Sequence, residues 1–221
     1  MEQAQATSLT QLTVGEFTER LSSAEPVPGG GSASALAAAL GASLVSMVAA
    51  LSAGRPKYAA YADTLDRCGL MGRELNARFL GLVERDAEAY GGYAAAMKLP
   101  RDTDEQKQTR QIAIREAARA ASEAPLDCVR ACVDLVNAAE SLAGRSNVNA
   151  SSDVLVAALL GEAAARGAAE NVLINLASTG DEVYAAEMQA EVDAALHDIA
   201  ALAARTREAV LSGQARDPEA E

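Results

Sequence analysis

The sequence has few aromatic residues, few cysteines and a single histidine. Aromatic residues make up 3% of the 221 residues, and there is no tryptophan. With so few aromatic and β-branched side chains, a β-sheet core is disfavoured. Cys68, Cys128 and Cys132 show no paired spacing, so we predict no disulfide framework. Because His197 is the only histidine, a Ser-His-Asp or Cys-His catalytic pair is disfavoured.

Basic residues are also scarce. The chain carries 19 Lys and Arg against 31 Asp and Glu, a formal net charge of −12. This balance argues against nucleic acid and against an anionic membrane as partners, but a local pair of basic residues could still hold a small anion. No positive charge precedes Arg20 and no apolar segment lies near the start. We therefore predict no signal peptide and expect a cytoplasmic location.

Long uncharged segments are limited to one, residues 26–54, which is long enough to raise the question of a membrane span. Its Ala and Ser content makes it weakly apolar, and no second span supports a membrane protein. The favoured interpretation is a central bundle helix whose small faces let its neighbours approach closely. Within it, Leu36, Leu40, Leu44, Met47, Val48 and Leu51 form one stripe at helical spacing.

Ala and Leu are abundant, and both favour helix. The sequence predicts an all-α, antiparallel up-and-down helical bundle in a single domain, residues 13–211, with a flexible N-terminus at 1–12 and a flexible tail at 212–221. We expect helices at 14–22, 32–52, 57–97, 104–121, 125–143, 153–177 and 181–211. An interruption at residues 91–92 is left open, and Pro125 is expected to begin a new helix.

One carboxylate in the long helix over residues 57–97 lies on the wrong face. At about 100° per residue, Asp86 is the only charged residue in line with the apolar stripe. A carboxylate that points into a core is costly unless it is paired, hydrogen-bonded or protonated, and desolvation raises its pKa. Two interpretations stay open, a structural Asp that satisfies a helix end or an arginine and a functional carboxylate.

The helix after residue 153 gives a second case. Its interior charges, Glu162, Arg166 and Glu170, form one solvent-facing stripe. Three polar residues fall opposite this stripe and so share the inward side of the helix: Asp153, Asn171 and Asn175. Asp153 also suits ordinary capping in a first turn, and the asparagines suit hydrogen bonds between helices. If these groups are functional, we expect them to converge with Asp86 inside the bundle.

A glycine turn, Gly29, Gly30, Gly31 and Ser32, precedes a predicted helix. Exposed backbone N–H groups at such a turn can bind an anion or a ligand oxygen. The spacing matches neither a Walker loop nor a dinucleotide-binding turn. Lys57, just after the end of that predicted helix, could add positive charge. No set of ligands with metal-binding spacing is visible, so we predict no metal site.

Three blocks of sequence resemble one family. They are PGGGSASALAAALGASLVSMVAALSAGRPKY, VERDAEAYGGYAAAMKLP, and SNVNASSDVLVAALL followed by NVLINL. In this order they resemble the cyclodeaminase domain of formiminotransferase-cyclodeaminase and the free-standing methenyltetrahydrofolate cyclohydrolases of the same family. This chain departs from the family at two places. It has Ser146-Asn147 where the family often has Gly-Asn, and Pro56 where the family often has a basic residue.

The resemblance implies an all-helical homodimer that handles one-carbon units on tetrahydrofolate. It places the catalytic aspartate at Asp86, the glycine turn at residues 29–32, and further folate-site residues at Lys57, Tyr58, Asn147, Ser152 and Asp153. As expectations, Asp86 is the general acid and base, and Asp153 stabilises the substrate cation or orients the pterin. The backbone N–H groups of the glycine turn, with Lys57, bind the pterin oxygen or the glutamate tail.

Two reactions follow from the resemblance. The expected one is cyclodeamination of 5-formiminotetrahydrofolate to 5,10-methenyltetrahydrofolate and ammonia, and the alternative is hydrolysis of the methenyl compound to 10-formyltetrahydrofolate. We expect a tetrahydrofolate substrate, with or without a polyglutamate tail, and no required metal or redox cofactor. A folate-binding bundle without turnover and a purely structural bundle are the alternatives from other classes.

Overall fold

The structure, a computed structural model, describes residues 8–218 and is all-helical over that range. Its α-helices are α1 (Val14–Leu21), α2 (Gly30–Ser52), α3 (Ala62–Met97), α4 (Asp104–Leu142), α5 (Ser151–Leu176) and α6 (Glu182–Ser212). Short 3₁₀ turns are η1 (Leu9–Gln11), η2 (Pro56–Tyr61) and η3 (Val148–Ala150). No strand occurs within residues 8–218. The predicted all-α bundle is confirmed.

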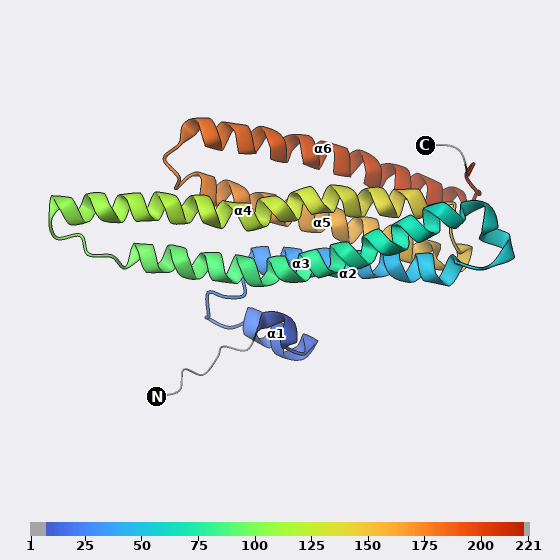
Figure 1. The fold of residues 1–221 in the computed structure, drawn as a ribbon, viewed down its shortest axis with the longest axis horizontal. Helices are drawn as coiled ribbons and strands as arrows, with labels where there is room; N and C mark the ends of the chain where they lie inside the picture. Colours follow the sequence, from blue (N-terminus) through green and yellow to red (C-terminus); the bar gives the residue numbers. More distant parts are fainter. Residues whose placement is uncertain (1–7, 219–221) are drawn as a thin grey trace.

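Helices α2 to α6 run alternately up and down along one long axis (Figure 1). Helix α2 packs against α3 and α5, α4 packs against α3 and α5, and α6 covers α4 and α5. The hairpin of α3 and α4 extends beyond the turn that joins α5 to α6 (Figure 1). One end of the bundle therefore carries a projecting pair of helices beside the start of α2.

Small side chains let the central helices pack closely. The inward side of α2 is made of Ala, Gly, Ser and Val residues, all buried. A Cβ atom on Gly72 of α3 would lie 2.8 Å from the carbonyl oxygen of Ala42, so glycine permits this helix contact. The expected close approach is confirmed. Most of the α2 stripe of larger residues lies on the outer side instead, with Leu40, Met47 and Leu51 exposed.

Two predicted helix boundaries are wrong. Helix α4 is continuous from Asp104 to Leu142 and contains Pro125, which we expected to begin a new helix. The first turns after residue 56 are 3₁₀, so the long helix begins at Ala62 rather than at residue 57, and it passes through Gly91 and Gly92 without interruption. A helix that is packed along its length tolerates residues that would end an isolated one.

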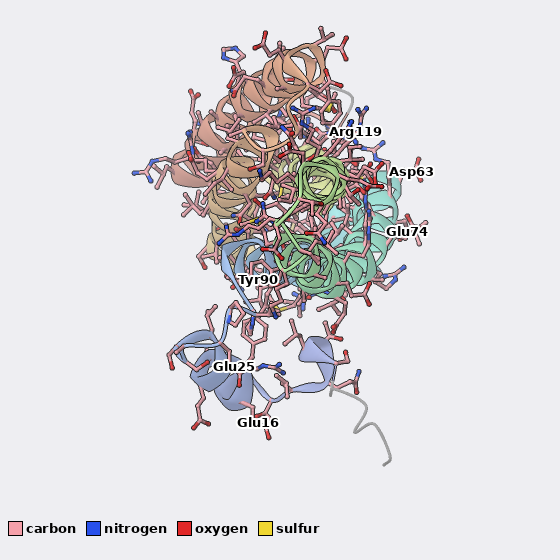
Figure 2. All side chains as sticks on the ribbon, turned by 90° about the vertical axis from the view of Figure 1, so that its left-hand side faces the viewer. Glu16, Glu25, Asp63, Glu74, Tyr90 and Arg119 are labelled. Atoms are coloured by element: carbon pink, nitrogen blue, oxygen red, sulfur yellow. The ribbon has the colours of Figure 1, made fainter. Side chains whose placement is uncertain are left out.

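The chain ends are held more firmly than the sequence suggests. Residues 8–12 were expected to be flexible, but the Glu84 carboxylate accepts hydrogen bonds from Ser8 Oγ and from the backbone N–H groups of Leu9 and Thr10. Viewed along the bundle, α1, which carries Glu16, lies outside the packed helices, as does Glu25 in the segment that follows it (Figure 2). Residues 1–7 lie outside the described part of the chain.

The predicted flexible tail is also fixed in part. The Arg216 guanidinium forms an ion pair with Glu140 at 2.9 Å, and its backbone N–H donates to the Gly144 carbonyl. Tyr61 Oη donates to the Arg216 carbonyl at 2.7 Å. Residues 213–217 therefore lie against the bundle, while residues 219–221 are outside the described range.

Helix α2 and the segment Val148–Leu176 are both long and apolar enough to cross a membrane by length and composition. The core helices of soluble bundles pass the same test. Each of these two helices packs against the other and against α4. They therefore form the centre of the bundle.

Candidate functional site

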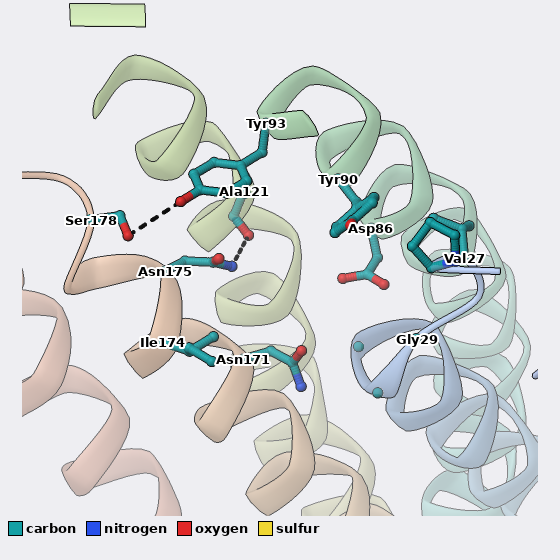
Figure 3. A pocket seen from close by; sticks show the side chains of 13 residues that line it. Val27, Gly29, Asp86, Tyr90, Tyr93, Ala121, Asn171, Ile174, Asn175 and Ser178 are labelled. Atoms are coloured by element: carbon teal, nitrogen blue, oxygen red, sulfur yellow. Dashed lines mark hydrogen bonds between the residues drawn. The ribbon is translucent and has the colours of Figure 1, made fainter. Parts of the chain in front are cut away.

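A cavity of about 360 Å³ opens at the end of the bundle where α2 begins (Figure 3). It lies between the glycine turn, the C-terminal halves of α3 and α5, and the middle of α4. Its lining comprises Pro26, Val27, Gly29, Gly30, Gly31, Asp86, Tyr90, Tyr93, Ala121, Asn171, Ile174, Asn175 and Ser178. Asp86 contributes the one carboxylate of this lining.

The Asp86 carboxylate lies directly against the start of α2. A Cβ atom on Gly31 would overlap Asp86 Oδ1, so only glycine allows this approach. Ser32 is fully buried and donates its hydroxyl to Asp86 Oδ2 at 2.8 Å and to the Val83 carbonyl at 3.2 Å. The glycine turn therefore sets where the carboxylate sits, and Ser32 fixes its orientation.

Burial raises the pKa of Asp86, because removal from water disfavours the charged carboxylate. Hydrogen bonds from the Ser32 hydroxyl and backbone N–H oppose this effect but do not cancel it. No cation lines the cavity, so no positive charge among its lining residues offsets the effect of burial on this pKa. A carboxyl group in this state can take up a proton near neutral pH more readily than an ordinary aspartate can.

The start of α2 offers donors beside that carboxylate. Gly29 is the N-cap and makes no side-chain cap hydrogen bond. The first N–H groups of an α-helix have no partner inside the helix. Those of Gly30 and Gly31 lie at the cavity wall, where they can donate to a ligand oxygen.

Two asparagines of α5 face the glycine turn across the cavity (Figure 3). Asn171 Nδ2 donates to the Gly167 carbonyl at 2.8 Å, and Asn175 Nδ2 donates to the Ala121 carbonyl at 2.9 Å. The side-chain oxygens of both accept no hydrogen bond from the described residues. They are therefore placed to accept hydrogen bonds from a bound ring.

The Asn175 contact is tied to the proline in α4. Pro125 has no N–H group, so the carbonyl four residues earlier, that of Ala121, lacks its helical partner. Asn175 supplies the missing donor from α5. The hydrogen bond lets α4 continue through Pro125, and it also orients the Asn175 side chain.

Sequence reasoning missed the aromatic part of the site. Tyr90 and Tyr93 fall on the predicted apolar stripe, but both line the cavity, and Tyr93 Oη contacts Ser178 Oγ at 3.5 Å. The rest of that stripe, including Leu75, Phe79 and Val83, is buried as expected. The missed signal is that the C-terminal end of this stripe consists of tyrosines, whose hydroxyl groups need polar partners, and that this end lies beside the end of α5.

The structure does not bring all the predicted site residues together. Asp86, residues 29–32, Asn171 and Asn175 meet at one end of the bundle. Asp153 precedes Asn171 by 18 residues of α5, which is about 27 Å at 1.5 Å per residue. Within one chain, the expected convergence of Asp153 with Asp86 is wrong.

Lys57, Tyr58, Asn147 and Ser152 also lie at the far end. Tyr58 and Asn147 are buried there, and their polar atoms serve the local fold. Tyr58 Oη accepts a hydrogen bond from the Val148 N–H, and Asn147 Oδ1 caps η3. Lys57 is exposed, with its ammonium group 5.4 Å from the centre of the Tyr58 ring.

No group of three or more His, Cys, Asp or Glu side chains suited to a metal ion occurs among residues 8–218. Cys68, Cys128 and Cys132 are free and buried. A hydrogen bond shared with Cys128, together with burial, raises the pKa of the Cys132 thiol well above its ordinary value. These thiols therefore pack as small apolar side chains.

Comparison with known proteins identifies the family. The family model described as formiminotransferase-cyclodeaminase matches residues 13–194. The methenyltetrahydrofolate cyclohydrolase of Methylorubrum extorquens is 37% identical over 200 residues, which cover 90% of this chain and 96% of that protein. The formimidoyltransferase-cyclodeaminase of Sus scrofa is 35% identical over 191 residues, 86% of this chain and 35% of that longer protein.

A solved structure, the formiminotetrahydrofolate cyclodeaminase of Thermotoga maritima, has the same fold. Its TM-score is 0.83 at 26% identity, over 92% of this chain and 98% of that one. The match therefore extends along nearly the whole of both bundles. This chain belongs to the formiminotransferase-cyclodeaminase family.

Proposed function

We propose that this protein is a tetrahydrofolate one-carbon enzyme that hydrolyses 5,10-methenyltetrahydrofolate to 10-formyltetrahydrofolate. The observation that carries the proposal is Asp86, a carboxylate with a raised pKa at the wall of a cavity that also holds free amide donors and acceptors. Similarity over 96% of a cyclohydrolase supports hydrolysis. Cyclodeamination is the second candidate, supported by the name of the structural relative.

In hydrolysis, a water oxygen bonds to the methenyl carbon while the Asp86 carboxylate takes one of the water protons. The product of this step is a neutral tetrahedral carbon that carries a hydroxyl group. The bond from this carbon to N5 then breaks, and Asp86 returns its proton to N5. The hydroxyl proton leaves to solvent as the formyl C=O forms, so one proton is released overall. A single group that accepts and then donates a proton suffices.

Cyclodeamination uses the same group on a different leaving atom. N10 bonds to the protonated formimino carbon, and Asp86 takes the N10 proton. It then gives this proton to the amino group, which leaves as ammonia, and the methenyl cation remains. While it is ionised, the Asp86 carboxylate also stabilises the cationic carbon in both reactions.

The rest of the cavity is suited to a pterin ring. Such a ring presents N–H donors and one carbonyl oxygen on one edge. The side-chain oxygens of Asn171 and Asn175 can accept from the donors, and the Gly30 and Gly31 N–H groups can donate to the oxygen. Tyr90 and Ile174 supply apolar surface for the ring faces.

One absorbance assay with two substrates tests the proposal. Loss of the methenyl chromophore above the spontaneous rate is expected with 5,10-methenyltetrahydrofolate. Growth of that chromophore from 5-formiminotetrahydrofolate would instead assign cyclodeamination. Absence of both changes, with folate bound, would leave only a binding protein. We also propose that no metal or redox cofactor is required, so the rate should survive dialysis against a chelator.

We also propose that the protein is a homodimer that pairs through α2 and α5. Leu40 is 55% exposed, and Val156 and Leu159 of the adjoining helix are 43% and 48% exposed. No charged residue occurs from residue 26 to residue 54, so the α2 part of this face can be covered without burying a charge. A two-fold axis would give each copy the same contacts.

An antiparallel pairing of α2 has a consequence for the site. The larger outward residues of α2 span Leu36 to Leu51, and their midpoint near residues 43–44 is also midway between Gly30 and Lys57. Pairing about that midpoint brings the C-terminal end of α2 of a second copy, and the η2 turn that carries Lys57, toward the Gly30 end of the first. The far-end residues can then serve the Asp86 cavity of the other copy.

Light scattering and complementation test this arrangement. We expect a mass twice 22.7 kDa, and a monomer for Leu40→Glu but not for Leu70→Glu, a control on exposed α3 surface. If Lys57 serves the other copy, mixing Asp86→Asn with Lys57→Gln should restore about a quarter of the wild-type activity, since half of the dimers then hold one intact site. A wild-type monomer contradicts the proposal, as does an absence of complementation.

A further inference from the structure

An open groove continues from the Asp86 cavity. It has a volume of about 520 Å³ and is lined by one face of α4 and the turn after α5. Ser178 lines both hollows, and the contact between its hydroxyl and that of Tyr93 marks the boundary between them. From Arg115 to Lys107 the groove follows eight residues of α4, about 12 Å, along the projecting hairpin (Figure 1).

The groove is basic, although the protein as a whole is strongly acidic. Lys107, Arg110 and Arg115 line it together with Gln111, and no acidic residue does. The chain carries a net charge of −12, so most of its surface repels an anion. A local group of three cations beside the cavity therefore has a marked effect on which ligands can approach it.

The three cations differ in how far they are already engaged. Arg110 donates to the Met97 carbonyl at 3.1 Å, which holds it across the hairpin. Lys107 pairs with Asp104, but the Asp104 side chain is 97% exposed, so the pair is weak. Arg115 forms no hydrogen bond or ion pair with any residue in the described range. Its guanidinium lies against the Gly180 turn, with donors left for a ligand.

We propose that this groove binds the carboxylates of the glutamate tail of the substrate, and that it prefers tails of several glutamates. The inference rests on the proposed function, since a folate in the Asp86 cavity must leave its tail outside. Each added glutamate contributes one carboxylate, and a guanidinium can bind a carboxylate through two parallel hydrogen bonds. Gln111 can donate to the amide carbonyls between them.

The groove begins close to the cavity along α4. Arg115 lies six residues before Ala121, which lines the cavity, so it is about 9 Å away along α4. A tail that leaves the cavity past Ser178 meets Arg115 first and Lys107 last.

The test compares monoglutamate and triglutamate forms of 5,10-methenyltetrahydrofolate. Arg115→Gln and Lys107→Gln should each raise KM about two- to fivefold, with kcat unchanged because the reacting carbon lies in the other hollow. The loss should be larger for the triglutamate and should shrink at high salt. Arg115→Lys should keep only part of the affinity, because an ammonium group cannot form the two parallel hydrogen bonds of a guanidinium. Arg207→Gln, at an exposed arginine of α6, should have no effect.

Calorimetric binding of 5-formyltetrahydrofolate, with one or three glutamates, separates the two proposals. Wild-type protein that binds the triglutamate more tightly than the monoglutamate but shows no turnover refutes the proposed function and supports the groove. Turnover by wild type, with equal binding of both tails and no change in the Arg115→Gln Lys107→Gln double variant, overturns the groove and leaves the function intact.

Discussion

Replacement of Asp86 by asparagine separates chemistry from structure in one change. The asparagine side chain has the same shape, and its amide oxygen can still accept the 2.8 Å hydrogen bond from Ser32 Oγ. It cannot take up a proton. Because general acid and base catalysis contributes about 10²- to 10⁴-fold, we expect kcat to fall at least about 100-fold, which is about 2.7 kcal/mol of barrier. KM should change little.

Stability gives an independent check on the same variant. The pKa of Asp86 is raised in the folded state by burial. Its contribution to folding stability is therefore complete below the unfolded-state pKa and is lost as pH rises through the folded-state pKa. At neutral pH, Asp86→Asn removes that loss, so the variant should unfold at the same temperature as wild type or higher.

The assay is loss of methenyl absorbance, measured with thermal unfolding on the same samples. The wild-type rate should fall on the acid side at a pH above that of an ordinary aspartate, because the ionised form is needed to accept the proton. Asp66→Asn, on the exposed side of the same helix, serves as the control. Near-wild-type turnover by Asp86→Asn, or a marked drop in its Tm, would refute the assigned role.

Three further variants test the surroundings of that carboxylate. Gly31→Ala places a methyl group on Asp86 Oδ1, so we expect at least a tenfold lower kcat and a destabilisation of about 1–3 kcal/mol by denaturant unfolding; unchanged kinetics would contradict the contact. Pro125→Ala restores an N–H that competes with Asn175 for the carbonyl of residue 121, so folate KM should rise several-fold with no loss of Tm, and an unchanged KM would show that this hydrogen bond does not orient Asn175 for binding. Glu84→Gln weakens the hydrogen bonds to residues 8–10. Burial raises the Glu84 pKa, but these hydrogen bonds outweigh it and the pKa is lowered, so the variant should lose about 1 kcal/mol of stability near pH 7 and the difference from wild type should vanish as pH falls through the folded-state pKa. Limited proteolysis of the N-terminus measures this difference.

The sequence predicts the helices well because the apolar spacing and the breaks at Pro and Gly are local signals. It also singles out Asp86, since one charge within an apolar stripe is visible at helical periodicity. It fails for Asp153, because periodicity gives the angle of a residue about the helix axis but not its height. Asp153 and Asn171 share an angle and lie at opposite ends of α5.

Pro125 and Asn175 explain why the other main error arose. Read locally, a proline ends a helix, because it leaves the carbonyl of Ala121 without a donor. The donor is supplied by Asn175, which lies 50 residues after Pro125 in the sequence. The inward polar residue of α5 and the proline of α4 are therefore linked through one hydrogen bond, and neither segment read alone predicts it. The same bond fixes the wall of the cavity opposite Asp86, so the local rule is overridden where the proposed chemistry needs a rigid surface.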